Sequence, residues 1–334
     1  MFRDTRRAKL TTGNSSLSNS QEKAATTIQK HVRRFLARRK YSIQHLREDQ
    51  QESYLTFVVG NDPWMPPSLD KYNEPNKKVA LIATSGMRAV SLACKLGNKK
   101  NIPKIVVIDN SSKVYKFWYE MREFIKYDKN AATAELFLKN LPSFLSSHKN
   151  LYRDLQDKCV FSDAPPGIKY LNQNINIYFN ELIEEYGYDY VRAVILHASL
   201  IKQSWADENV FVKVKNILAY QGIDTIYMYP SNMVACIQDP EIRDQVLENI
   251  ANANPVLSIY TDYCQIHRRP ENVYLLENNY PDQVANTIFA PGKCASNYPS
   301  KISLADLEFL FSPLQSKNSS EFDNNYNNNK NNNP

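Results

Sequence analysis

The chain has 334 residues, of which 43% are hydrophobic and 11% aromatic, and its formal net charge is +6 at pH 7. This composition is typical of a folded protein with a large core and excludes a fully disordered chain. No apolar run of about 18 residues is present, so the sequence predicts no membrane-spanning helix.

The positive charge is concentrated near the N-terminus. Residues 1–50 contain twelve Lys and Arg and four Asp and Glu, a net +8, so the other residues sum to about −2. The first 19 residues are basic and rich in hydroxyl groups but lack the apolar region of a secretory signal. We expect residues 1–19 to be a disordered tail, although an organelle transit peptide has a similar composition.

A helix is predicted from about residue 20 to residue 50, and Ser18 with Gln21 resembles a capping box at its start. Four apolar residues in this segment follow the helical spacing i, i+4, i+7 and i+8, and they form one stripe: Ile28, Val32, Phe35 and Leu36. Basic residues flank the stripe: Arg33, Arg34, Arg38, Arg39 and Lys40. A helix docked on its own core, a helix on an anionic membrane and a nucleic-acid contact all fit this pattern.

The finer spacing resembles the IQ motif, a helical element that binds calmodulin. Ile28 and Gln29 give the aliphatic residue and the glutamine of the motif, and Arg33, Arg38 and Tyr41 follow at its later positions. Arg34 stands where the motif has glycine. The resemblance implies a calmodulin or calmodulin-like partner, whose acidic, Met-rich lobes would contact Ile28, Gln29, Val32, Arg33, Phe35, Leu36, Arg38 and Tyr41.

Residues 51–78 are predicted to be a connector, because four prolines fall between residues 60 and 78. From residue 79 short apolar runs alternate with amphipathic segments. The runs predict strands over 79–84, 104–110, 158–162, 191–199 and 224–230, with a later pair over 255–261 and 271–278. Segment 112–157 is expected to form two or three helices. The fold prediction is therefore α/β and Rossmann-like, with a mostly parallel doubly wound sheet over 79–312 and an N-terminal amphipathic helix. The Asn-rich segment 313–334 is predicted to be a disordered tail.

The first part of this α/β region has the order of a nucleotide-binding unit. A strand, a turn over 83–86, a helix and a second strand ending in Asp109 follow one another. An acid at that position commonly binds ribose hydroxyls, although it is also an ordinary residue for a turn. Neither GxGxxG nor a P-loop is present, which disfavours NAD, FAD and P-loop nucleotides.

Residues 79–290 resemble the class I S-adenosylmethionine (SAM)-dependent transferase fold, and the second half is weakly similar to the nicotianamine synthase group. The resemblance implies SAM as a cofactor, transferring either its methyl or its aminocarboxypropyl group. It implies cofactor contacts from Ser85, Gly86, Asp109, Asp163 and Ser199. His197, expected to follow the fourth strand, is the candidate general base, and Tyr115 is the second candidate catalytic residue; both are also common as structural residues.

The five cysteines are scattered and form no CxxC pair, so we expect reduced thiols, a cytoplasmic location and no metal site. The sequence favours a calmodulin-regulated SAM-dependent transferase of unknown acceptor in the eukaryotic cytosol, whether native or delivered by a microbe. The alternative is a non-catalytic calmodulin-binding adaptor on a degenerate Rossmann-like fold. A nucleic-acid-modifying enzyme is disfavoured because residues 51–334 carry no excess of positive charge.

Overall fold

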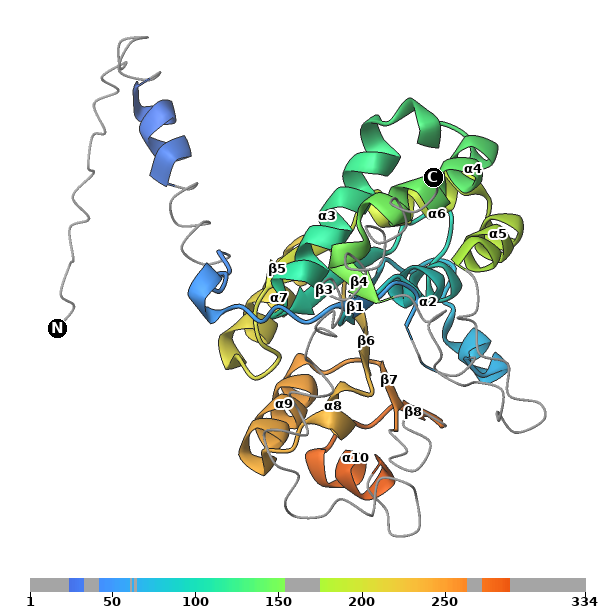
Figure 1. Ribbon diagram of the computed structural model, residues 1–334. Coiled ribbons are helices and arrows are strands. Elements are labelled where there is room, and N and C mark those ends of the chain that lie inside the picture. Colours follow the sequence, from blue (N-terminus) through green and yellow to red (C-terminus); the bar gives the residue numbers. More distant parts are fainter. Residues whose placement is uncertain are drawn as a thin grey trace, which may run out of the picture. The chain divides into compact units, whose positions relative to one another are not determined.

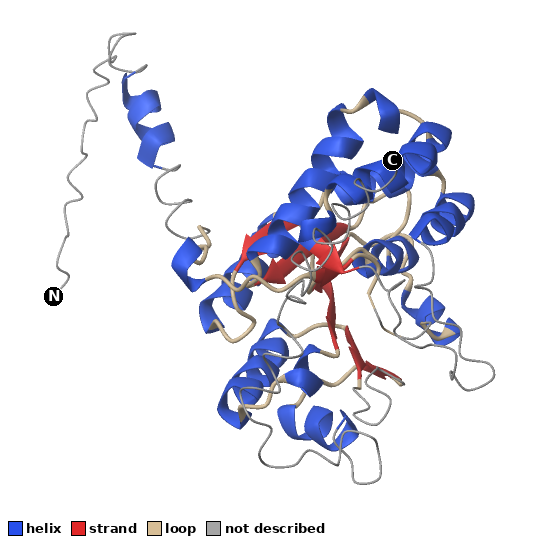
Figure 2. Ribbon diagram, in the orientation of Figure 1, coloured by secondary structure: helices blue, strands red, loops and turns tan. Residues whose placement is uncertain are grey.

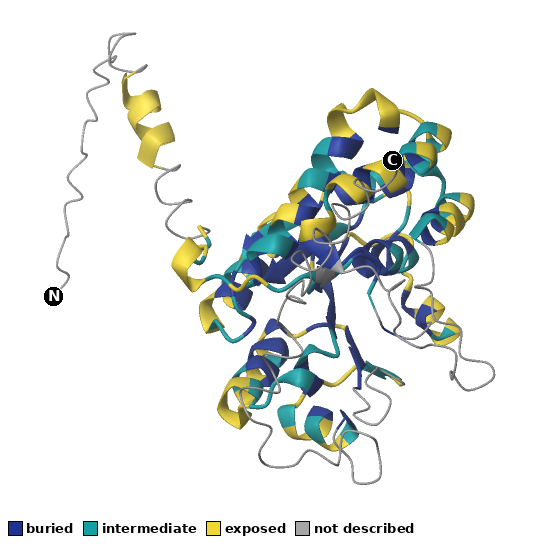
Figure 3. Cartoon of the chain, in the orientation of Figure 1, coloured by how far each residue is buried: buried dark blue, intermediate teal, exposed yellow. Residues whose placement is uncertain are grey.

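The structure, a computed structural model, describes residues 24–32, 42–60, 62, 65–153, 175–262 and 272–288. The chain divides into two compact units, Met1–Ser42 and Ile43–Pro334. In the first unit, residues 24–32 form a helix whose side chains are all exposed, as Figure 3 shows. The helix predicted over 20–50 does not continue through residues 42–47, which are not helical.

The second unit is built on a six-stranded sheet with the order β5-β3-β2-β6-β7-β8 (Figure 1). Five neighbouring strands are parallel, and β8 is antiparallel to β7. The strands are β2 (Val79–Ala83), β3 (Lys104–Asp109), β5 (Ser199–Lys202), β6 (Thr225–Ser231), β7 (Leu257–Thr261) and β8 (Val273–Leu276). The predicted α/β, Rossmann-like fold is confirmed.

Helices cover both faces of the sheet, and Figure 2 shows the strands between them. On one face lie α2 (Arg88–Leu96), α3 (Ser112–Tyr127), α4 (Ala134–Ser147), α5 (Ile175–Tyr186) and α6 (Tyr188–Leu196). On the other lie α7 (Glu208–Tyr220), α8 (Met233–Cys236), α9 (Pro240–Ala253) and α10 (Pro281–Ile288). Side chains of a strand alternate between the faces, so Leu81 joins the core under α3 while Ile82 joins the core under α9.

One predicted strand is a helix. Residues 191–199 were expected to be extended, but α6 ends at Leu196 and β5 begins at Ser199. The buried residues Tyr190, Val191, Val194 and Ile195 follow helical spacing. A short apolar run does not distinguish a strand from a buried helix by its pattern alone, which explains the error. The strand predicted over 158–162 lies outside the described residues.

The described part of the second unit also contains shorter elements: the strands β1 (Thr56–Phe57) and β4 (Tyr152–Arg153) and the 3-10 helices η1 (Glu48–Gln50), η2 (Pro67–Tyr72), η3 (Lys129–Ala131) and η4 (Lys149–Leu151). Strands β1 and β4 pair in parallel as a separate two-stranded sheet. Within the described ranges, no helix has both the length and the apolar character needed to cross a bilayer.

Candidate functional site

A single segment runs along the carboxyl ends of the parallel strands. It comprises residues 43–60 and 62, and we call it the strap. In open α/β sheets this edge is where ligands bind, at the point where the strand order reverses. That point lies here between β2 and β6. The contacts of the strap follow the order of the sheet, from β5 through β3 and β2 to β6 and β7.

The strap begins at β5, the edge strand of the sheet. The amide of Leu46 donates to the Lys202 carbonyl at 2.8 Å, and the amide of Lys202 donates to Nδ1 of His45 at 3.0 Å. The Gln203 side chain donates to the Gln44 carbonyl at 3.0 Å. Ile43 packs against the core under α9. These contacts pair backbone groups that an edge strand would otherwise leave open.

At the end of β3 the strap reaches the carboxylate of Asp109, which is only 4% exposed. Oδ1 accepts hydrogen bonds from the Tyr54 hydroxyl at 2.5 Å and the Ser111 amide at 2.9 Å. Oδ2 accepts from the Thr84 hydroxyl at 3.0 Å and the Ser85 amide at 3.1 Å. Burial raises the pKa of Asp109 from its ordinary value, and burial together with this carboxylate raises the pKa of Tyr54 well above its own. Both carboxylate oxygens are thus occupied by donors of the chain itself.

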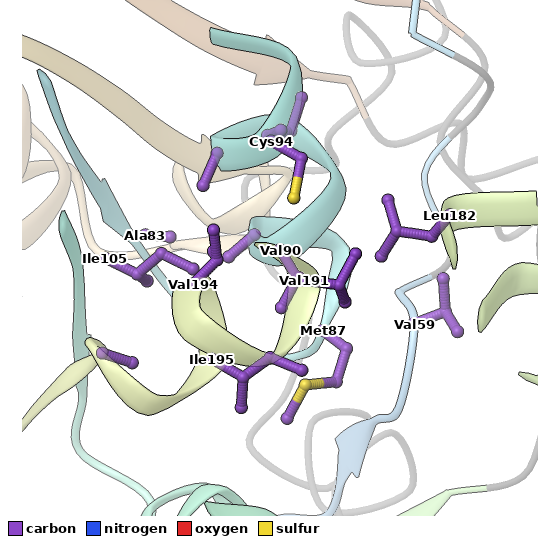
Figure 4. Packing of buried hydrophobic residues seen from close by; sticks show 14 of the residues in the cluster. Val59, Ala83, Met87, Val90, Cys94, Ile105, Leu182, Val191, Val194 and Ile195 are labelled. Carbon is purple, nitrogen blue, oxygen red and sulfur yellow. The ribbon is translucent and has the colours of Figure 1, made fainter. Parts of the chain in front are cut away.

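The strap also packs onto the loop after β2. The amide of Met87 donates to the Val58 carbonyl at 2.5 Å, and a Cβ on Gly86 would lie 2.7 Å from that same oxygen. The Trp118 indole donates to the Ser85 carbonyl at 2.6 Å from the other side. Figure 4 shows Val59 in the same apolar cluster as Met87. The loop expected to hold a cofactor is therefore in direct contact with the strap and with α3.

The strap ends in a buried carboxylate, Asp62, at β6 and β7. Its Oδ2 accepts from the hydroxyls of Tyr229 and, at 2.7 Å, Ser231, and its Oδ1 accepts from the Thr261 hydroxyl at 2.8 Å. The Arg88 guanidinium donates to the Asp62 carbonyl at 2.8 Å. Asp62 is fully buried, and its three hydroxyl partners supply the hydrogen bonds that a buried carboxylate requires.

Three of the predicted cofactor residues meet at this edge: Ser85, Gly86 and Asp109. Tyr115 lies near them in the first turn of α3, and Nζ of Lys202 sits 4.8 Å from the centre of its ring. These four residues therefore lie at the same edge, where the Asp109 carboxylate and the loop backbone are already engaged, and their roles in cofactor binding and catalysis stay a prediction.

The expected position of His197 and Ser199 is corrected. They follow helix α6, and Ser199 is the first residue of β5, opposite Val106, while Asp109 lies opposite Lys202. His197 and Ser199 are therefore at the amino end of the strand, away from the edge that carries Asp109. The cause is the helix that replaces the predicted fourth strand. Asp163 lies outside the described residues.

Of the predicted calmodulin contacts, Ile28, Gln29 and Val32 lie on the exposed helix of residues 24–32. The others lie outside the described residues: Arg33, Phe35, Leu36, Arg38 and Tyr41. Sequence reasoning missed Tyr54 and Asp62, which fell in the predicted connector. The apolar run from Leu55 to Val59 was the available signal, because a solvated linker has no need of it. No group of three or more His, Cys, Asp or Glu side chains able to hold a metal occurs among the described residues.

The close approach at Gly86 predicts a measurable loss of stability. Gly86→Ala should lower the free energy of unfolding by about 2 kcal/mol, because the new methyl group meets strap backbone that cannot rotate away. Urea denaturation measures the change. Gly222→Ala is the control: its φ of +72° costs about 1 kcal/mol, but its nearest neighbour is the Lys78 side chain at 3.9 Å. Equal losses in the two variants would contradict the packing of the strap on Gly86.

His45 predicts a pH dependence of the strap contact at β5. Burial and the charge of Lys202 lower the pKa of His45 below 6.5, and Nδ1 must be unprotonated to accept the Lys202 amide. A lowered histidine pKa contributes stability that is present above about pH 6.5 and lost as the pH falls below it. The stability difference between wild type and His45→Gln should therefore shrink between pH 7.5 and pH 5.5. A difference that stays constant over this range would count against the contact.

Residues 22–42 match the model of the IQ calmodulin-binding motif, which confirms the resemblance found in the sequence. No curated protein matches the chain closely enough to be called a relative. The chain thus carries an IQ calmodulin-binding motif, and the strap follows that motif directly.

Proposed function

We propose that the chain binds calmodulin or a calmodulin-like protein through residues 22–42, and that its α/β unit acts as a non-catalytic scaffold while the strap is in place. The observation that carries the scaffold role is the occupancy of Asp109. Its four hydrogen bonds to the chain leave no oxygen for a ribose hydroxyl.

The charge and exposure of the motif support the proposed partner. Residues 22–42 contain seven Lys and Arg and one Glu, a net +6. Ile28 is 63% exposed and Val32 49% exposed, so both apolar side chains are free to enter a groove. Calmodulin lobes offer an apolar groove rimmed by carboxylates, and calmodulin is a cytosolic eukaryotic protein. The proposal therefore places the chain in the eukaryotic cytosol.

Calorimetry with calmodulin, in calcium and in chelator, tests the proposed partner. Ile28→Asp should weaken binding at least tenfold, because it puts a carboxylate into an apolar groove whose rim is already acidic. Val212→Asp is the matched control, since Val212 is an aliphatic residue of α7 with a similar exposure of 50%. Unaltered affinity of the Ile28 variant, or absence of wild-type binding in both conditions, would reject the proposal.

A SAM-dependent transferase opened by calmodulin is the second candidate function. Two observations favour it: the strand order, which brings an acid at the end of β3 next to the loop after β2, and the continuity of the strap with the IQ motif. In this account the partner frees the strap, and Asp109 exchanges the Tyr54 hydroxyl for a ribose hydroxyl. In this account the residues of the edge that the strap uncovers would select the acceptor and determine which group of SAM is transferred.

SAM titrations separate the two candidates. If the strap blocks the site, wild type should bind SAM only with calmodulin present, and Asp109→Ala should bind in neither condition because the ribose acceptor is missing. Tyr54→Phe should bind SAM more tightly than wild type without calmodulin. Heat of SAM binding in none of these samples, with calmodulin bound normally, would leave the scaffold as the function.

A further inference from the structure

The apolar stripe of the IQ segment continues beyond the motif. Leu46 lies 18 residues after Ile28, which is five helical turns, and Ile43 lies 15 residues after it, about 60° around the axis. A helix prolonged from the motif to residue 46 would therefore present Ile43 and Leu46 on the same face as Ile28 and Val32.

In the structure these two residues belong to the α/β unit instead. Ile43 packs against the core under α9, and the Leu46 amide bonds to the edge strand β5. Residues 42–47 are not helical, so the spacing that suits a partner helix is not used here. The sequence of this segment fits two environments, and it can occupy only one of them at a time.

We propose that the docking surface for a calmodulin-type lobe extends past the IQ motif to Ile43 and Leu46, so that the partner takes these residues from the α/β unit and loosens the strap. This inference rests on the proposed calmodulin binding. The charge pattern sets the limit of the surface: Arg47 is basic, but Glu48 and Asp49 would face an acidic partner.

Because the partner and the α/β unit compete for the same residues, calmodulin binding and attachment of the strap weaken each other. If calmodulin binding loosens the strap, then any change that loosens the strap must tighten calmodulin binding by the same factor. Tyr54 is suited to this test because it lies outside the proposed surface and holds the strap through Asp109 and Asn110, at 2.5 Å and 2.8 Å.

Hydrogen exchange on the full chain, with and without calmodulin, measures the release directly. The amide of Lys202, bonded to His45, and the amide of Ser112, bonded to the Glu52 carbonyl at 2.9 Å, should exchange faster in the complex. Unchanged exchange at both amides, with protection confined to residues 22–42, would overturn the extended surface and leave the proposed calmodulin binding intact. No binding at all would remove both.

Variants give a second readout by calorimetry. Tyr54→Phe should tighten calmodulin binding about fivefold, because the strap loses a hydrogen bond to a carboxylate. Ser53→Ala, at the exposed neighbouring position, is the control and should change nothing. In the Tyr54→Phe background Leu46→Ala should weaken binding, because it removes an apolar side chain of the proposed surface while the bond of the Leu46 amide to β5 is unaffected. Equal affinity of wild type and Tyr54→Phe would reject the competition.

Discussion

The buried carboxylate of Asp109 is the interaction on which the carboxyl edge of the sheet depends. A carboxylate removed from water is tolerated only when hydrogen bonds replace its hydration. Here the donors come from three places: the strap, the loop after β2 and the start of the segment leading into α3. One group therefore fixes the positions of three segments that are far apart in the sequence.

Asp62 mirrors this arrangement from the opposite side. At Asp109 the α/β unit supplies the acid and the strap supplies the donor; at Asp62 the strap supplies the acid, and strands β6 and β7 supply the hydroxyls. Two buried acids, one at the end of β3 and one in the strap, therefore hold the strap at separate points. A contact of this kind resists partial detachment, because lifting the strap at Asp109 removes one donor from a buried carboxylate, and lifting it at Asp62 leaves the hydroxyls of β6 and β7 without that acceptor.

The sheet was predictable because parallel strands buried on both faces are continuous apolar runs, as at Val79–Ala83. The same reasoning gave a wrong prediction for residues 191–199, since an apolar run of that length fits a buried helix such as α6 equally well. Asp109 was placed correctly by its position at the end of β3, but its partner Tyr54 was not foreseen. Nothing local marks Tyr54 as a donor to a residue 55 positions away. The prolines after residue 60 also concealed the strap, because they suggested a solvated connector.

The order of the chain has a consequence for synthesis on the ribosome. Asp62 and its partner Thr261 are 199 residues apart, so the last strap contact cannot form until β7 has been translated. The IQ segment, by contrast, is complete after residue 42. Proteins are made from the N-terminus, and their domains fold as they emerge. The newborn chain therefore displays its basic helix for most of its synthesis, before the strap has all its contacts, so any protein that binds the motif during synthesis would meet the open form before the closed form exists.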